Sequence, residues 1–177
     1  CLVADDHPAV VEAVCDYLEA NGIEIAGRAR DGEEAATKIE TRKPAVALVD
    51  LRMPRLSGIE LARRTTRSSP TTSIILYTAF GDRALLTEAL DAGARGFVLK
   101  EAPLADLMRA VEMVAAGHTY VDPVLAGVLA SSEAAAKLPA LAKSMGQSAR
   151  VFKGEMKAMK DDDVADATAP SVAAERT

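Results

Sequence analysis

Apolar residues follow two patterns along residues 1–116, and together these patterns predict a fold. Short runs without polar alternation are typical of strands buried on both faces, as in the middle of a parallel sheet. Such runs predict strands at residues 1–4, 23–29, 45–49, 73–78 and 96–100. Between them, apolar positions recur every three or four residues, which predicts helices at residues 8–20, 33–42, 58–67, 82–91 and 103–116.

Strands and helices that alternate in this way pair in parallel through right-handed crossovers. We therefore expect an α/β fold with a doubly wound five-stranded parallel sheet and helices on both of its faces. In the last expected helix, four apolar residues share one side and are predicted to face the sheet: Leu104, Leu107, Val111 and Val114.

Polar residues stand where four of the expected strands end. They are Asp5 and Asp6 after the first strand, Asp50 after the third, Thr78 at the end of the fourth and Lys100 at the end of the fifth. Because the carboxyl ends of parallel strands lie at the edge where open α/β sheets bind ligands, we expect these side chains to meet. Each residue alone has an ordinary explanation, such as a helix-capping acid or a surface lysine. Four strand ends together favour a site.

The chemistry of this group favours a metal-assisted phosphoryl acceptor. Two carboxylates about 4 Å apart repel each other by roughly 4 kcal/mol at an effective dielectric constant near 20, and a divalent cation removes that cost. Oxygen ligands without a cysteine or a histidine partner favour Mg²⁺ over zinc. Lys100 adds a positive charge and Thr78 a hydroxyl donor. The group thus contains the parts needed to transfer a phosphoryl group onto Asp50.

Composition narrows the class of protein. The 177 residues suit one domain and an appendage, and 49% hydrophobic residues with only 3% aromatic residues indicate an aliphatic core. The net charge of −5 does not suit a nucleic-acid-binding domain with a basic face. Two cysteines are too few for a disulfide framework, and no apolar run is long enough for a membrane span. The expected location is the cytoplasm.

Four segments resemble the receiver domain of two-component response regulators, over about residues 1–122. They are Val-Ala-Asp-Asp-His-Pro at 3–8, Val-Asp-Leu-Arg-Met-Pro at 49–54 with Ser57-Gly58, Tyr-Thr-Ala at 77–79 and Gly-Phe-Val-Leu-Lys at 96–100. The resemblance implies that Asp50 is the phosphoacceptor and takes its phosphoryl group from a sensor histidine kinase. It also implies a signalling switch and not an enzyme, with at most slow self-dephosphorylation.

The resemblance further implies roles for the residues around Asp50. Thr78 and Lys100 contact the phosphoryl group. Four groups hold Mg²⁺: the carboxylates of Asp5 (through water), Asp6 and Asp50, and the backbone carbonyl of Arg52.

The switch that the family implies consists of Thr78 and Phe97. Movement of Thr78 would free space for Phe97 to rotate inward and would alter the face formed by the fourth helix, the fifth strand and the fifth helix. A core aromatic residue at the start of a strand is the alternative interpretation of Phe97. We interpret His7, beside the acid pair, as a turn residue and not a ligand, because it has no second histidine.

Residues beyond 116 indicate the branch of the family. The segment from Gly117 to Pro123 and the pair Lys100-Glu101 resemble the LuxR/NarL branch. Members of this branch continue into a DNA-binding helix-turn-helix, which residues 124–177 do not resemble, so DNA binding by this chain is not expected. We divide the chain into a receiver domain (1–122), a linker or helix (123–137), a basic amphipathic helix (138–160) and a disordered acidic tail (161–177).

The tail supports an alternative function. Residues 137–157 resemble the amphipathic helix of the small twin-arginine translocase subunit, although that family's membrane-spanning helix and Phe-Gly hinge are absent. The alternative is a membrane-surface or translocase-associated protein that makes peripheral membrane contact through residues 138–160. Docking of this helix on its own domain and formation of a homodimer are left open.

Three further classes are less favoured. A transcription factor would need the basic reading helix that the chain lacks. A hydrolase with an aspartate nucleophile would carry a second acid two residues further on, where this chain has Arg52. A nucleotide or flavin binder would carry a glycine-rich loop after its first strand, where this chain has acids.

Overall fold

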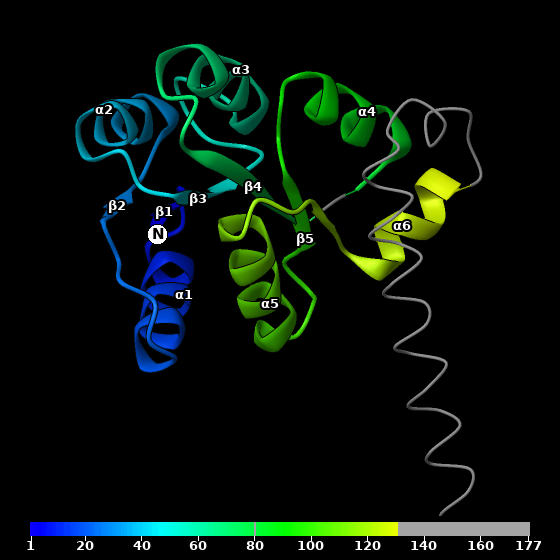
Figure 1. Ribbon diagram of the computed structural model, residues 1–177, viewed down its shortest axis with the longest axis horizontal. Helices are drawn as coiled ribbons and strands as arrows, with labels where there is room; N and C mark the ends of the chain where they lie inside the picture. Colours follow the sequence, from blue (N-terminus) through cyan, green and yellow to red (C-terminus); the bar gives the residue numbers. More distant parts are fainter. Residues whose placement is uncertain (80, 131–177) are drawn as a thin grey trace, which may run out of the picture. The chain divides into compact units, whose positions relative to one another are not determined.

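The computed structural model describes residues 1–79 and 81–130 (Figure 1). The strands in this part are β1 (Leu2–Ala4), β2 (Gly27–Ala29), β3 (Val46–Asp50), β4 (Ser73–Thr78), β5 (Gly96–Leu99) and β6 (Tyr120–Val121). The helices are α1 (Pro8–Ala20), α2 (Gly32–Arg42), α3 (Gly58–Ser68), α4 (Arg83–Asp91), α5 (Leu104–Ala115) and α6 (Pro123–Ala130). The alternation of strands and helices predicted from the sequence is confirmed.

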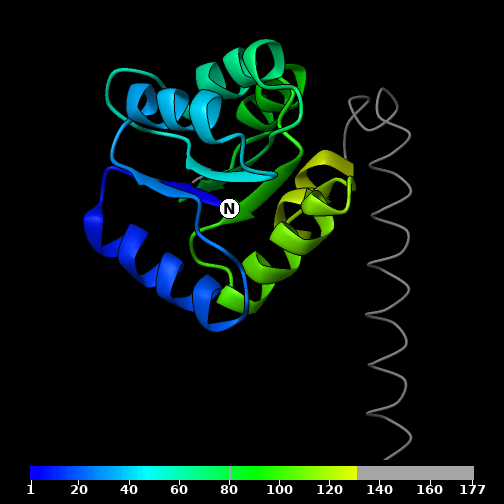
Figure 2. The ribbon, with the colours of Figure 1, turned by 60° about the vertical axis from the view of Figure 1, so that its left-hand side comes forward.

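All neighbouring strands pair in parallel, in the order β2-β1-β3-β4-β5-β6. Helices α1 and α5 cover one face of the sheet, and α2, α3 and α4 cover the other (Figures 1 and 2). This is the doubly wound α/β fold that the sequence predicts. The connections change direction between β1 and β3, which places the carboxyl ends of these two strands at the point where such sheets bind ligands.

Strand side chains alternate between two core clusters, one on each face of the sheet. Ala47 and Val49 of β3 belong to the cluster under α2, α3 and α4. Val46 and Leu48 belong to the cluster that contains α1 and α5 residues. All residues of β3 are buried, which explains why this segment shows no polar alternation.

Short local signals fix where three helices begin. The Asp31 side chain accepts two backbone N–H bonds at the start of α2, and the Asp82 side chain accepts one at the start of α4. Helix α3 begins with a capping box, in which Ser57 and Glu60 bond each other's backbone N–H groups. These bonds satisfy donors that have no partner inside a helix. The caps therefore set where the loops at the carboxyl edge of the sheet end.

The strands differ from the prediction in three places. Strand β6 pairs with β5 and makes the sheet six-stranded; two residues are too few to give a recognisable pattern. Strand β2 begins at Gly27 and not at Ile23, because Ile23 and Ile25 pack against the α1–α5 core cluster without joining the sheet. Strand β5 ends at Leu99, so Lys100 lies in the turn that follows it.

One residue of α5 also differs from the prediction. The buried side of α5 is formed by Leu107, Ala110, Val111 and Val114. Leu104 begins the helix and is 36% exposed, so the prediction that it faces the sheet is wrong. At about 100° per residue, Leu104 is rotated to the edge of the buried stripe.

Several predictions concern residues that the structure does not describe. The basic helix at 138–160, the acidic tail at 161–177 and the resemblance to the translocase subunit all lie outside the described residues. Helix α6 occupies the first part of the segment 123–137, and the division of the chain at these positions stays a prediction. Among residues 1–79 and 81–130, no helix is long and apolar enough to cross a membrane.

Candidate functional site

Asp50 ends the central strand β3 and lies between the ends of β1 and β4. Its side chain is 8% exposed. Asp5 follows β1 and is held by its backbone N–H, which donates to the carbonyl of Ala29 at the end of β2, 3.1 Å away. The topology therefore brings two acids that are 45 positions apart in the sequence to one edge of the sheet.

Lys100 joins these two acids. Its Nζ lies 2.6 Å from Asp5 Oδ2 and 3.2 Å from Asp50 Oδ1. The side chains of Asp5, Asp50 and Lys100 are 2%, 8% and 19% exposed, so the three charges interact with little screening by water. The expected meeting of Asp5, Asp50 and Lys100 is observed.

The pKa values of two of these groups reflect their surroundings. Burial raises the pKa of Asp50, and the negative charge of Asp5 adds to this, against the opposing attraction of Lys100. Burial alone would lower the pKa of Lys100, but its hydrogen bond to Asp5 and the attraction of Asp50 outweigh burial and raise it. Lys100 is therefore an ammonium ion at neutral pH, whereas the carboxylate form of Asp50 is destabilised.

His7 lies closer to the acids than its interpretation as a turn residue implied. It is the N-cap residue of α1, as expected for a turn, and its backbone N–H donates to Asp5 Oδ1 over 3.0 Å. Its ring Nδ1 also lies 2.8 Å from Asp6 Oδ1 and 3.2 Å from Asp5 Oδ1. Asp5, Asp6 and His7 together offer ligand atoms within 4.8 Å of one another. The adjacency of His7 to the acid pair was the sequence signal for this contact.

Thr78, the last residue of β4, and Arg52, in the loop after β3, lie at the same edge of the sheet. Thr78 ends β4, is 6% exposed, and its carbonyl accepts the backbone N–H of Lys100 over 2.8 Å. Arg52 stands two residues after Asp50, in the loop of residues 51–57 that connects β3 to α3. The positions of both residues agree with a place beside Asp50.

Phe97 is already buried and does not lie in an outward position. It is 2% exposed and belongs to the core cluster under α2, α3 and α4. With Leu51, Thr78 and Gly81 it lines a small apolar pocket beside Asp50. This burial agrees with the alternative interpretation of Phe97 as a core aromatic residue at the start of a strand.

The donor set fits a hard divalent cation. Three carboxylates against one ammonium leave the site with excess negative charge, and carboxylate oxygens are the ligands that Mg²⁺ prefers. The side chain of Asp6 is 33% exposed, which leaves the acid pair open to solvent on one side. The residues present therefore fit a magnesium site.

The family model of the response regulator receiver domain matches residues 1–112. Because this match covers more than half of the chain, the protein belongs to the response regulator receiver domain family.

Individual relatives agree with this assignment and with the predicted LuxR/NarL branch. The response regulator GacA of Pseudomonas viridiflava is 36% identical over 130 residues, which cover 73% of this chain and 61% of the relative. The signal receiver domain of the response regulator NarL from Mycobacterium tuberculosis is 36% identical, with a TM-score of 0.63 and coverage of 66% of this chain and 95% of that domain.

A third relative was solved with a mimic of the phosphoryl group. The isolated receiver domain of RcsB from Salmonella enterica serovar Typhimurium, in the presence of the phosphomimetic BeF₃⁻, is 28% identical with a TM-score of 0.67. The match covers 72% of this chain and 96% of that domain. The curated relatives are longer than the part that they share with this chain, which spans about three fifths of their length.

Proposed function

We propose that this chain accepts a phosphoryl group on Asp50 from a sensor histidine kinase in a Mg²⁺-dependent reaction, and that this modification switches an output surface. The observation that carries the proposal is the placement of Lys100 Nζ within 3.2 Å of Asp50 and 2.6 Å of Asp5 at the carboxyl edge of the sheet. The acceptor Asp50, the cation Lys100 and the further acid Asp5 thus lie together at one edge of the sheet.

The acids around Asp50 would hold the metal. Asp5, Asp6, Asp50 and the backbone carbonyl of Arg52 are the proposed Mg²⁺ groups. Bound Mg²⁺ would offset the repulsion between these acids and an incoming phosphoryl group. Asp5 also holds Lys100, so its carboxylate positions the ammonium ion as well.

Asp50 acts as the nucleophile. One carboxylate oxygen of Asp50 forms a bond to phosphorus as the bond from phosphorus to the donor histidine breaks, and the donor leaves with the bonding electron pair. The product is an aspartyl phosphate. In this proposal Lys100 and the hydroxyl of Thr78 contact the new phosphoryl oxygens. We propose at most slow self-dephosphorylation, because Arg52 stands where a hydrolase of this kind would need an acid.

The new charge supplies the free energy of the switch. A phosphoryl group adds a charge of about −1.5 to −2. Moving a population from 1:99 to 99:1 requires about 5.5 kcal/mol, and a few charge-assisted hydrogen bonds at roughly 1.5–3 kcal/mol each can provide it.

The proposed output surface is the face formed by α4, β5 and α5, and α6 packs against α4 beside it. Leu125 of α6 is 2% exposed and belongs to the same core cluster as Phe97. A Cβ at position 81 would lie 2.1 Å from Leu125 Cδ2, so any larger residue there would require the Leu125 side chain to move. Asp122 Oδ1 accepts the backbone N–H of Val124 at the start of α6. We propose that a change at Thr78 is passed to α6 through Phe97 and Leu125, which share this core cluster.

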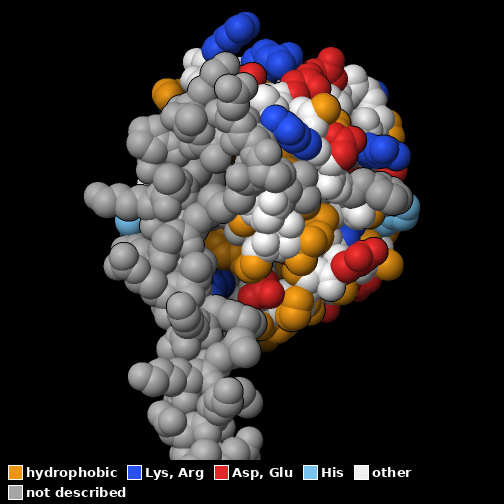
Figure 3. Space-filling view, turned by 90° about the vertical axis from the view of Figure 1, so that its right-hand side faces the viewer, with side chains coloured by type: hydrophobic (Ala, Val, Ile, Leu, Met, Phe, Trp, Pro, Cys, Tyr) orange, Lys and Arg blue, Asp and Glu red, His pale blue; other side chains and the backbone are white. Residues whose placement is uncertain are grey.

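The side of the molecule that carries α6 also exposes apolar groups. Figure 3 shows hydrophobic side chains among charged ones on this side. In the described part of the chain, Val124 of α6 is 68% exposed and is, with Leu104, one of two exposed large hydrophobic residues. We propose that the sensor kinase and a second copy of the chain are partners and that the protein acts in the cytoplasm.

The proposal is tested by intact mass after incubation with acetyl phosphate and Mg²⁺. The wild type is expected to gain about 80 Da, the mass of one covalent phosphoryl group. Asp50→Ala is expected to gain nothing, whereas Glu88→Ala, which removes an exposed acid on α4, gains the same mass as the wild type. Equal labelling of the wild type and Asp50→Ala would remove Asp50 from its role.

A further inference from the structure

The loop of residues 51–57 leaves Asp50 and carries Arg52, so its position matters for the proposed metal. Its base is closed by a hydrogen bond from the N–H of Gly58 to the carbonyl of Leu51, 3.0 Å long. A Cβ at position 58 would lie 2.5 Å from the carbonyl oxygen of Asp50. The base of the loop thus depends on a glycine that lets α3 start directly against Asp50.

The tip of the same loop rests on the first residue of α2. The N–H of Gly32 donates to the carbonyl of Pro54 over 3.3 Å. A Cβ on Gly32 would lie 2.0 Å from the carbonyl oxygen of Leu56 and 2.5 Å from its Cβ. A carbon and an oxygen atom cannot approach so closely, so any side chain at position 32 would displace the backbone of the loop.

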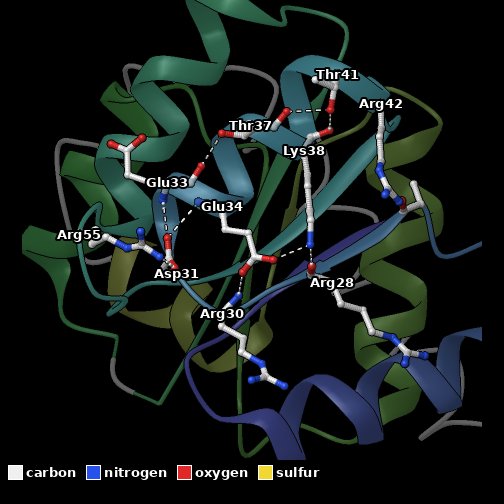
Figure 4. A network of polar contacts seen from close by, with 11 residues as sticks. Arg28, Arg30, Asp31, Glu33, Glu34, Thr37, Lys38, Thr41, Arg42 and Arg55 are labelled. Atoms are coloured by element: carbon white, nitrogen blue, oxygen red, sulfur yellow. Dashed lines mark hydrogen bonds and ion pairs between the residues drawn. The ribbon is translucent and has the colours of Figure 1, made fainter.

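An ion pair joins the same two segments (Figure 4). The guanidinium of Arg55 contacts Asp31 Oδ2. The other oxygen of Asp31 accepts the backbone N–H groups of Glu33 and Glu34 and so caps α2. Arg55 has a φ of +69°, a left-handed conformation that is uncommon for residues other than glycine. The contact with Asp31 and the turn at Arg55 therefore define one conformation of the loop tip.

We propose that Asp31, Gly32 and Arg55 form a latch that positions the 51–57 loop, and that they are thereby positioning residues for Mg²⁺ binding beside Asp50. This inference rests on the proposed function. The latch acts through the backbone of the loop, because it fixes the tip while the Gly58 bond fixes the base, and Arg52 lies between the two.

The two parts of the latch differ in strength. The side chain of Arg55 is 65% exposed, whereas that of Asp31 is 9% exposed, so water weakens the ion pair. The contact of Gly32 with Leu56 is steric and is not screened. A substitution at Gly32 should therefore disturb the loop more than the loss of the Arg55 side chain.

The test is isothermal titration of the full chain with MgCl₂. Gly32→Ala is expected to raise the Mg²⁺ Kd about 10-fold, the low end for loss of a group that orients a metal ligand. Arg55→Gly suits the left-handed backbone and removes the whole side chain with its guanidinium, so we expect the Kd to rise about threefold. Arg55→Lys keeps a cation at this position and should restore most of the affinity. The rate of Asp50 phosphorylation at saturating Mg²⁺ should stay close to that of the wild type in each variant.

Arg64→Gln is the matched control. Arg64 also pairs α3 with α2, through Glu33 and Glu40, but does not contact the loop. The Mg²⁺ Kd of the Arg64→Gln variant is expected to equal that of the wild type. The latch is refuted if Arg55→Gly binds Mg²⁺ as the wild type does, or if Arg64→Gln weakens binding as much; Arg55→Gly decides the matter should Gly32→Ala fail to fold. A wild type that binds no Mg²⁺ or is not phosphorylated refutes the proposed function itself, whatever the variants do.

Discussion

Two groups of charged side chains in this protein use the same chemistry in different surroundings. The sheet-edge site, formed by Asp5, Asp50 and Lys100, has nitrogen–oxygen distances of 2.6 and 3.2 Å. The α2–α3 surface network, formed by Glu33, Glu34, Lys38, Glu40 and Arg64, has distances of 2.5, 3.0 and 3.1 Å. Distance alone does not separate a site from a surface contact.

Exposure separates them. Side chains of the sheet-edge site are 2% to 19% exposed, and those of the surface network are 29% to 47% exposed. In the buried group each charge acts strongly on its neighbours. Burial also raises the pKa of Asp50, and the charge of Asp5 adds to this against the attraction of Lys100. In the exposed network water screens each pair and little free energy is gained. Removal of one charged group should therefore have a large effect at the sheet-edge site and a small effect in the surface network.

The largest effect is expected for Lys100→Met, which leaves both acids of the sheet-edge site without their cation. The initial rate of labelling by acetyl phosphate should fall about 10- to 100-fold, since a hydrogen bond to a charged group contributes roughly 1.5–3 kcal/mol. Rapid-quench measurement of the acyl phosphate gives this rate. Arg64→Gln, which removes a cation from the surface network, should keep the wild-type rate. An equal loss of rate in the two variants would contradict the claim that burial makes the sheet-edge charges more important.

The next effect concerns the metal. At a free Mg²⁺ concentration of about 100 Kd, binding should stabilise the folded wild type by about 2.7 kcal/mol. Asp6→Ala removes a proposed ligand and should lose most of this gain. Urea unfolding in MgCl₂ and in EDTA measures both values, with Glu88→Gln as a control for the loss of an exposed acid. An Asp6→Ala variant that gains as much from Mg²⁺ as the wild type would exclude Asp6 as a ligand.

A smaller effect, with a defined pH dependence, is expected for Asp50→Asn in metal-free protein. Burial and the charge of Asp5 raise the pKa of Asp50 above its value in the unfolded chain. Between those two pKa values the folded protein holds a proton that the unfolded chain has lost, so stability falls as the pH rises through this window. The ionised carboxylate thus opposes folding at pH 7.

Asparagine at this position removes that cost. We expect the free energy of unfolding at pH 7 to rise by about 1.4 kcal/mol for each unit by which folding raises the pKa of Asp50. The gain should vanish below about pH 3, under the ordinary range of an aspartate carboxyl group, where Asp50 is protonated in both the folded and the unfolded chain. Urea denaturation at the two pH values measures it, and a gain of the same size at both would contradict this explanation.

The smallest effect is expected within the surface network. Lys38→Gln removes an ion pair with Glu34 one helical turn away and a bond to the carbonyl of Arg28. Because both side chains are partly exposed, the free energy of unfolding should fall by about 0.5 kcal/mol or less. Urea denaturation of the two proteins provides the value. A loss as large as that of a buried pair would show that exposure does not govern these contacts.

Five of the six strands and most of the sheet-edge site could be predicted from the sequence. Buried parallel strands leave uninterrupted apolar runs, and the residue that ends each run marks the edge, so Asp5, Asp50 and Lys100 could be brought together before any coordinates. The capping residues that fix the starts of α2, α3 and α4 are also local signals.

Other features depend on contacts between distant segments and leave no local pattern. Arg55 and Asp31 are 24 positions apart, and the residues next to them in the sequence do not indicate that the two form an ion pair. The need for glycine at position 32 comes from the backbone of Leu56, which is 24 positions away in the sequence. Strand β6 forms only because β5 offers it a partner.

The central claim is that Asp50 is the residue to which the phosphoryl group becomes attached. The most direct measurement is reduction of the acetyl phosphate-treated protein with borohydride, which converts an aspartyl phosphate to homoserine, followed by peptide mapping by mass spectrometry. We predict that the modified residue is Asp50 and that labelling requires Mg²⁺. Modification at Asp5 or Asp6 in place of Asp50, or labelling that persists unchanged in EDTA, would contradict the account.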